Sequence, residues 1–156
     1  MNIRRAKLED AMALAEFNIK MALETEAIDL IPEVIGAGVK TMINNPQMGF
    51  YLVAEDDSGI QASLMITTEW SDWRNGLFWW IQSVYVNQSS RRQGLYRKLY
   101  QKAKELAEAE SHVCGFRLYV EHDNTIAQKT YRSLNMKETS YKLFEELKTE
   151  TRYRKS

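Results

Sequence analysis

From residue 84 to residue 97 the chain reads Val84-Tyr85-Val86-Asn87-Gln88-Ser89-Ser90-Arg91-Arg92-Gln93-Gly94-Leu95-Tyr96-Arg97. Apolar residues typical of a strand lead into a polar turn, and the turn opens directly onto a helix. The first N–H groups of a helix have no intrahelical acceptor, and the helix dipole adds partial positive charge beside them. Together with the arginines of the turn, this junction predicts a binding site for a phosphorylated ligand.

Hydrophobic periodicity predicts the elements on either side of this junction. Before it we expect a short strand, two helices and an antiparallel meander whose hairpin turns are Asp56–Gly59 and Asp72–Gly76. The expected strands are 3–5, 50–54, 60–68 and 77–86, and the expected helices are 9–24 and 32–44.

After the junction the pattern continues with helices and strands in alternation. We expect a helix over 94–110, a strand over 116–121, a helix capped by Asp123 or Asn124 and ending at Leu134, and a strand or hairpin arm over 136–147. The predicted fold class is therefore α/β, with a mixed, mostly antiparallel sheet and helices on both faces. Residues 1–148 are expected to form one domain, and residues 149–156 a polar, frayed tail.

Composition narrows the functional classes. The 156 residues carry 21 basic and 21 acidic side chains, which argues against a nucleic-acid partner. No apolar run resembles a signal peptide or reaches the length of a membrane span, so we expect a cytoplasmic protein that does not associate with membranes. The single cysteine, Cys114, excludes an internal disulfide and a multi-thiolate metal site, and we expect it to be buried. No metal site is predicted.

A second segment, which follows the next expected strand, supports a functional interpretation of this junction. Asn124-Thr125-Ile126-Ala127-Gln128-Lys129-Thr130-Tyr131-Arg132-Ser133-Leu134-Asn135-Met136 places Asn, Ala and Tyr at fixed offsets on a short helix. With the turn around Gly94, this segment resembles the GNAT superfamily of acyl-CoA N-acyltransferases. That family carries Q/R-x-x-G-x-G/A after its fourth strand and N-x-x-A-x-x-x-Y-x-x-x-G-F about one strand later. The expected order of strands and helices also matches, so the resemblance covers nearly the whole chain.

The resemblance implies acetyl-CoA as co-substrate. In the family, the fourth strand binds the pantetheine arm through its backbone and the turn binds the pyrophosphate through N–H groups. Tyr96 departs from the family, which has Gly or Ala there; its side chain must point away from the ligand or it would obstruct the pocket. Asn135 replaces a Gly, which is acceptable because Asn tolerates left-handed backbone. The implied cofactor-binding residues are Val84, Tyr85, Val86, Arg91, Arg92, Gln93, Gly94, Leu95, Tyr96, Arg97, Asn124 and Ala127.

Tyr131 is the residue that the resemblance implies for catalysis. A phenol with a pKa near about 10 is well matched to protonating a departing thiolate. The alternative is that Tyr131 is an amphipathic core residue of its helix.

The general base is left open. Relatives place a glutamate where this chain has Gln82, and an amide cannot act as a base. Gln82 could orient a water molecule or hold the substrate, and Glu69, Asp72, Glu121 and His122 could act through water or simply be solvated.

The aromatic stretch from Glu69 to Trp80 could cover the sheet, form a dimer contact, or receive a cationic or aromatic amine on Trp73 and Trp80. We therefore count Gln82, Glu69, Trp73 and Trp80 as candidate substrate residues.

The activity predicted from these observations is transfer of an acetyl group from acetyl-CoA to a primary amine by direct attack, with a small-molecule acceptor. The alternatives are acetylation of a protein or peptide, and an acyl-CoA-binding regulatory module without turnover. The family often forms dimers, so a homodimer is a further expectation.

Overall fold

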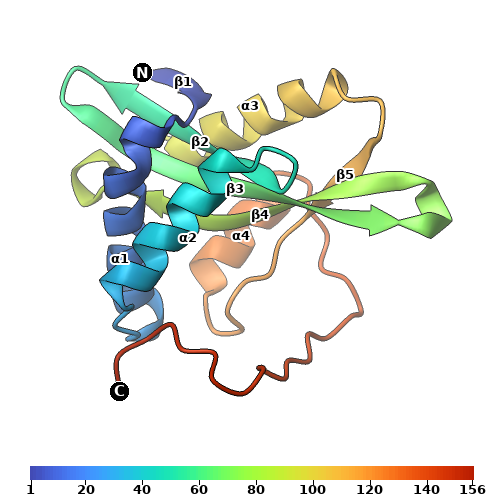
Figure 1. The fold of residues 1–156 in the computed structure, drawn as a ribbon. Helices are drawn as coiled ribbons and strands as arrows, with labels where there is room; N and C mark the ends of the chain where they lie inside the picture. Colours follow the sequence, from blue (N-terminus) through green and yellow to red (C-terminus); the bar gives the residue numbers. More distant parts are fainter. The chain divides into compact units, whose positions relative to one another are not determined.

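The strands form one five-stranded sheet in which neighbours in sequence are neighbours in space. The computed structural model describes residues 1–156. The order is β1-β2-β3-β4-β5; β1 to β4 pair antiparallel and β5 runs parallel to β4 (Figure 1). The strands are β1 (Asn2–Arg5), β2 (Gly49–Asp56), β3 (Gly59–Ser71), β4 (Gly76–Val86) and β5 (Val113–Arg117).

Four α-helices and three short 3₁₀ helices complete the chain. The α-helices are α1 (Ala11–Glu26), α2 (Pro32–Asn44), α3 (Leu95–Glu108) and α4 (Thr125–Ser133). The 3₁₀ helices are η1 (Leu8–Asp10), η2 (Asp72–Arg74) and η3 (Gln88–Ser90). None of these helices combines the length and the apolar character that crossing a membrane requires.

The chain divides into two compact units. The first comprises Met1–Leu118 together with Tyr153–Ser156, and it holds the whole sheet with α1, α2 and α3. The second comprises Tyr119–Arg152 and holds α4.

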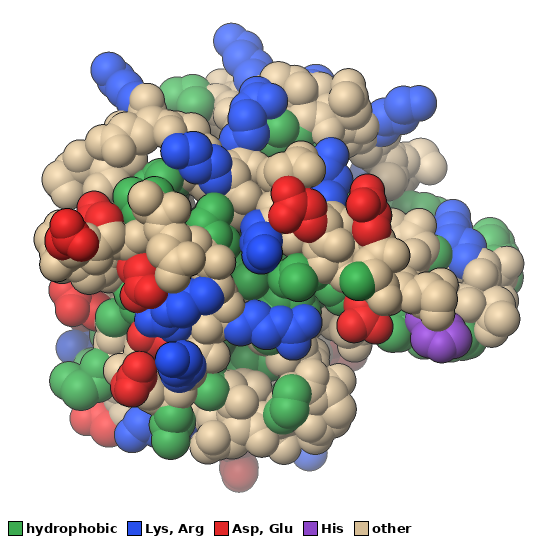
Figure 2. All heavy atoms as spheres, turned by 90° about the horizontal axis from the view of Figure 1, so that it is seen from above, with side chains coloured by type: hydrophobic (Ala, Val, Ile, Leu, Met, Phe, Trp, Pro, Cys, Tyr) green, Lys and Arg blue, Asp and Glu red, His purple; other side chains and the backbone are tan.

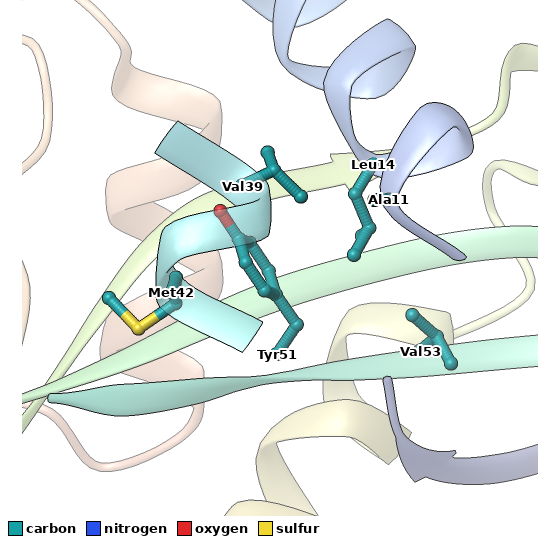
Figure 3. Close-up of a cluster of buried hydrophobic side chains, with 6 residues drawn as sticks. All are labelled: Ala11, Leu14, Val39, Met42, Tyr51 and Val53. Carbon is teal, nitrogen blue, oxygen red and sulfur yellow. The ribbon is translucent and has the colours of Figure 1, made fainter. Parts of the chain in front are cut away.

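In the first unit, helices cover both faces of the sheet. Ala11 and Leu14 of α1 and Val39 and Met42 of α2 pack with Tyr51 and Val53 of β2 (Figure 3). Burial raises the pKa of the Tyr51 phenol to about 12. Leu52 and Ala54 point to the opposite face and are also fully buried. A strand buried on both sides needs a second layer, and α3 supplies it with Leu95, Leu99 and Ala103.

The structure confirms most of the expected elements. All four strands and both helices expected before the junction are present, and the helix after it forms as α3. The expected α/β fold class, with a mixed and mostly antiparallel sheet, is confirmed. The strand expected over 116–121 is displaced to Val113–Arg117. As an edge strand, β5 leaves Cys114 exposed, so the prediction that this thiol is buried is wrong.

The strand expected over 136–147 does not form. No backbone N–H or C=O group of residues 137–147 is hydrogen-bonded to another backbone group, and a strand without a partner has no ladder. Apolar side chains therefore remain in solvent here, with Phe144 91% exposed. The prediction of a strand or hairpin arm over 136–147 is therefore wrong.

The tail is also more ordered than expected at its end. The Ile31 N–H donates to the Tyr153 carbonyl over 3.0 Å, and the Lys155 N–H donates to the Asp29 carbonyl over 2.8 Å. These bonds form an antiparallel bridge between Leu30 and Arg154. The last residues of the chain are thus fixed to the loop between α1 and α2.

A charged network joins β1 to β2 and η1. The Arg4 guanidinium lies 2.8 Å from a carboxylate oxygen of Asp10 and 2.8 Å from one of Glu55. Its hydrogen bonds lower the pKa of both carboxyl groups. Asp10 is buried and also accepts from the Lys7 N–H, so the network is part of the packed structure rather than a solvated surface pair.

We predict that Arg4→Met lowers the free energy of unfolding at pH 7 by about 2 kcal/mol, because it leaves a buried carboxylate without its partner. Carboxyl groups with lowered pKa values stabilise the fold above their ordinary pKa of about 4, and this contribution is lost as the pH falls through the folded values. The difference between Arg4→Met and wild type should therefore shrink below about pH 4.

Urea unfolding of both proteins at several pH values measures this difference in the free energy of unfolding. Lys20→Met is the control, because its pair with Glu16 is solvent-exposed and should contribute at most a few tenths of a kcal/mol. An Arg4→Met effect of the same size at pH 3 and pH 7 would contradict the ionic explanation.

Candidate functional site

The site in the first unit begins with an unpaired edge of β4. On one side β4 pairs with β3 from Gly76 to Val86. On the other side it pairs with β5 only over Leu77–Trp80. From Ile81 to Val86, that second edge has no strand partner, so its backbone polar groups are available to a ligand.

A β-bulge lies within this free edge. Tyr85 pairs with Ser63 and Gln82 pairs with Met65, so Leu64 faces two residues of β4, Ser83 and Val84. Ser83 has φ +51°, a left-handed conformation that is uncommon for a residue other than glycine. The bulge bends the strand and redirects the groups that follow it.

Beyond β4, the chain turns through η3 and a second left-handed segment before α3. Arg92 has φ +64° and Gly94 has φ +70°. The N–H groups of Arg92, Gln93, Gly94, Leu95 and Arg97 donate to no backbone acceptor. Such a concentration of N–H groups at a helix start, with the helix dipole behind it, binds anions such as phosphate.

Gly94 leaves this turn open. A Cβ atom at position 94 would have no protein atom within 4 Å. Arg92, Gln93 and Gly94 are all exposed. The arrangement therefore leaves room for a phosphate group against the backbone, and the phosphate site stays a prediction.

The arginines of the turn differ in their surroundings. Arg91 donates to the Glu24 carboxylate over 2.7 Å and, through Nε, to the Val86 carbonyl over 2.9 Å. The Arg91 bond lowers the pKa of Glu24. Arg91 thus joins α1 to the end of β4, whereas Arg92 and Arg97 form no ion pair. A phosphate role fits Arg92 and Arg97 better than Arg91, and the predicted roles of all three arginines stay predictions.

Tyr85 and Tyr96 contribute packing to this region. The Tyr85 ring lies 4.8 Å from the Phe17 ring of α1, and its hydroxyl donates to Glu24 over 3.3 Å. Only the backbone of Tyr85 is therefore placed to meet a ligand. The Tyr96 ring is parallel to the Tyr100 ring one helical turn further on, with centroids 6.2 Å apart. This orientation along α3 agrees with a side chain that does not fill the turn.

In the second unit, α4 aligns the three residues of the other motif. The Asn124 side-chain oxygen accepts from the Ala127 N–H over 3.1 Å, so Asn124 is the N-cap of α4. Tyr131 lies one turn beyond Ala127 on the same side of the helix. Asn135 ends the helix in a left-handed conformation, φ +67°, as predicted. Burial raises the pKa of the Tyr131 phenol, which therefore stays protonated at neutral pH.

Three of the four candidate substrate residues, all except Glu69, fall into two places in the first unit. Gln82 and Trp80 project from the same side of β4, and the Gln82 amide donates to the Thr67 hydroxyl over 3.0 Å. Trp73 lies instead in η2, at the tip of the β3–β4 hairpin, and is 86% exposed. The strand from Gly76 to Gln82 spans roughly 20 Å at about 3.3 Å per residue. The structure thus brings Gln82 and Trp80 together, but not Trp73.

The candidate bases all have local partners. Glu69 pairs with Arg117 over 2.6 Å, and this guanidinium lies 3.7 Å from the Phe78 ring centroid. Asp72 accepts from the Trp73 N–H, and Glu121 accepts from the Asp123 N–H. His122 is exposed, with its ring nitrogen 3.4 Å from the Asp123 carboxylate. The geometry favours none of them as a base.

Charge is dispersed over the face on which α3 lies. Figure 2 shows Lys and Arg side chains there as separate projections among acidic and uncharged ones. No group of three or more His, Cys, Asp and Glu side chains is arranged to hold a metal ion. The feature that suits an anion in the first unit is the group of backbone N–H groups in the turn before α3.

Sequence analysis missed the residues that hold this turn in place. Glu24 of α1 reaches Tyr85, Gln88 and Arg91, and Gln61 of β3 reaches Asn87 and Ser90. These partners are far apart in sequence. The available signal for Gln61 was a polar residue among the mostly apolar residues 60–66 of β3, which indicates a buried partner.

Comparisons with known proteins identify the fold. The model of the acetyltransferase (GNAT) family matches residues 14–136. A possible acetyltransferase from Clostridium difficile 630 is 41% identical, with 94% of this chain and 96% of that chain covered and a TM-score of 0.88. A structure described as a probable acetyltransferase is 24% identical, with 97% and 100% covered and a TM-score of 0.82.

A third structure is a predicted acetyltransferase from Clostridium acetobutylicum, solved with acetyl-CoA. It is 18% identical, with 93% of this chain and 95% of that chain covered and a TM-score of 0.77. The search of curated proteins found no match.

We predict that Gly94→Ala weakens coenzyme A binding about tenfold, or about 1.4 kcal/mol, because a methyl group would occupy the space beside the N–H groups. The left-handed backbone also makes alanine less stable there by about 1 kcal/mol. Calorimetric titration with coenzyme A measures the binding. Asn75→Ala is the control, because residue 75 is also left-handed (φ +48°) but lies at the hairpin tip. Equal affinity in Gly94→Ala and wild type would exclude the turn as the phosphate site.

Proposed function

Since this chain belongs to the acetyltransferase (GNAT) family, we propose that it transfers an acetyl group from acetyl-CoA to a primary amine of a small molecule. The amine attacks the thioester directly. An N–C bond forms, the C–S bond breaks, the ammonium proton passes to water or a base, and the coenzyme A thiolate takes up a proton.

One observation carries this proposal: the free edge of β4 leads directly to the N–H groups before α3. Coenzyme A has the matching order of groups, an arm with two amides joined to a diphosphate. Strand edges hydrogen-bond amides, and a helix start with left-handed residues holds phosphate. Val84 to Val86 would bind the arm, and Arg92 to Arg97 the diphosphate.

Tyr131 is the proposed proton donor to the leaving thiolate. The role rests on the position of this residue in the family motif and on the raised pKa of its phenol. A donor must be protonated, and a raised pKa keeps it so over the whole neutral range. Loss of activity through its ionisation would occur only above about pH 10.

Gln82 and Trp80 are the proposed contacts of the acceptor. The Gln82 amide is oriented by Thr67 and still has its oxygen available to accept from an ammonium or a water molecule. An indole face beside it suits a cationic amine. Because no carboxylate occupies this position, the proton of the attacking amine would leave through water.

A thioester-cleavage screen tests the proposed activity. Release of coenzyme A from acetyl-CoA is measured with polyamines, amino acids, aminoglycosides and peptides as acceptors. Turnover with a small amine supports the proposal, whereas turnover with peptides alone indicates a protein acetyltransferase. Binding of acetyl-CoA with no turnover on any amine indicates a regulatory module.

We predict that Tyr131→Phe lowers kcat by at least about a hundredfold, because the thiolate would leave unprotonated. The Kd for acetyl-CoA should change less than twofold. Steady-state kinetics and calorimetry measure the two quantities. Tyr141→Phe is the matched control, because the Tyr141 side chain is exposed on a segment without backbone partners. Wild-type kcat in Tyr131→Phe would remove its assignment as proton donor.

We further predict that Trp80→Ala raises the KM for the best amine of the screen about tenfold, in line with loss of a cation–π contact and apolar surface. Trp73→Ala, at the hairpin tip, should leave this KM unchanged. If Trp73→Ala alone raised KM, the acceptor would bind at the tip and the placement beside Gln82 would be wrong.

A further inference from the structure

Gln61 holds the connection between β4 and the phosphate turn. Its side chain is buried, at 7% exposure, near the start of β3, which is the central strand of the sheet. The amide oxygen accepts from the Ser90 hydroxyl over 3.0 Å and from the Asn87 amide over 3.3 Å. The amide nitrogen donates to the Asp56 carboxylate over 3.2 Å and to the Gly59 carbonyl over 3.4 Å.

These contacts fall at both ends of η3. Asn87 is the first residue after β4, and its N–H also donates to the Gln61 carbonyl over 2.8 Å. Ser90 is the last residue of η3, is itself buried, and directly precedes the turn. One residue of β3 therefore fixes the entry and the exit of the segment that leads to Arg92 and Gly94.

Besides Gln61, the contacts that hold the turn are those of Arg91 and Leu95 at its two ends. The N–H groups of Arg92, Gln93 and Gly94 have no backbone acceptor, and their side chains are exposed. Arg91 is held from outside by Glu24 and Val86, and Leu95 by the core. If a turn is mobile before binding, the ligand must order it, and the entropy lost in ordering lowers the affinity. A turn that is already ordered does not carry this cost.

We propose that Gln61 is a positioning residue for the diphosphate end of coenzyme A: through Asn87 and Ser90 it orders the turn before the ligand arrives. The inference rests on the proposed function. Gln61 itself does not contact the ligand. Loss of Gln61 should therefore weaken binding of the diphosphate and leave binding of the pantetheine arm unchanged. A general loss of stability would weaken both.

The experiment compares two thioester substrates that share the reacting group and the arm. Acetyl-CoA carries the diphosphate, and S-acetylpantetheine does not. In Gln61→Leu, which keeps the bulk but loses all four hydrogen bonds, kcat/KM for acetyl-CoA should fall about tenfold through KM. Its kcat at saturating acetyl-CoA and its kcat/KM for S-acetylpantetheine should match wild type.

A pair of serine variants separates the two sides of the network. Ser90→Ala removes the hydrogen bond on the turn side and should raise the KM for acetyl-CoA about threefold. Ser58→Ala removes the hydrogen bond from the Ser58 hydroxyl to Asp56 on the hairpin side and should leave the KM for acetyl-CoA unchanged. Ser90→Ala keeps the test decisive if Gln61→Leu does not fold, which thermal unfolding would show.

The outcomes distinguish this inference from the proposed function. If wild type neither binds nor cleaves acetyl-CoA, both are wrong. A different outcome is that wild type is active while Ser90→Ala and Gln61→Leu lower kcat/KM equally for both thioesters, or leave kcat/KM for both thioesters unchanged. In either case only the positioning role is wrong. A loss confined to acetyl-CoA supports it.

Discussion

The candidate site depends on the unequal pairing of β4. Its pairing with β3 runs from Gly76 to Val86 and is interrupted only by the bulge at Ser83 and Val84, so the strand is held near both of its ends. Its pairing with β5 stops at Trp80, so the second half keeps an open edge. A fully paired strand would have no backbone groups to offer, and a fully unpaired one would not hold its shape. The combination supplies rigid backbone donors and acceptors at the surface.

The turn before α3 extends this principle beyond the sheet. Its candidate recognition groups are backbone N–H groups, and several side chains around it hold it in place. Glu24 and Arg91 join it to α1, and Gln61 joins it to β3. Buried polar groups of this kind are costly unless every donor and acceptor is satisfied, and the Gln61 amide satisfies that condition on both of its ends.

Sequence indicated most of the fold because its signals are local. Turn residues such as Asn75 and caps such as Asn124 act within a few positions, and the apolar spacing of α3 identifies its buried face. The phosphate turn and α4 were recognisable for the same reason. Features set by distant partners were not predictable: the failure of residues 136–147 to pair, the exposure of Cys114 on an edge strand, the bridge between Leu30 and Arg154, and the contacts of Glu24 and Gln61.

The extra residue of the bulge at Ser83 also determines which helical layer each part of β4 contacts. Before the bulge, Trp79 packs on Phe116, which contacts Tyr100 of α3. After it, Tyr85 packs on Phe17 of α1, on the opposite layer. Deleting one residue here would reverse the direction of every later β4 side chain, so Tyr85 would leave α1 and Glu24 would lose a partner. Both helical layers therefore constrain how far this strand can change in length, which makes it a poor place for insertions or deletions during evolution or engineering.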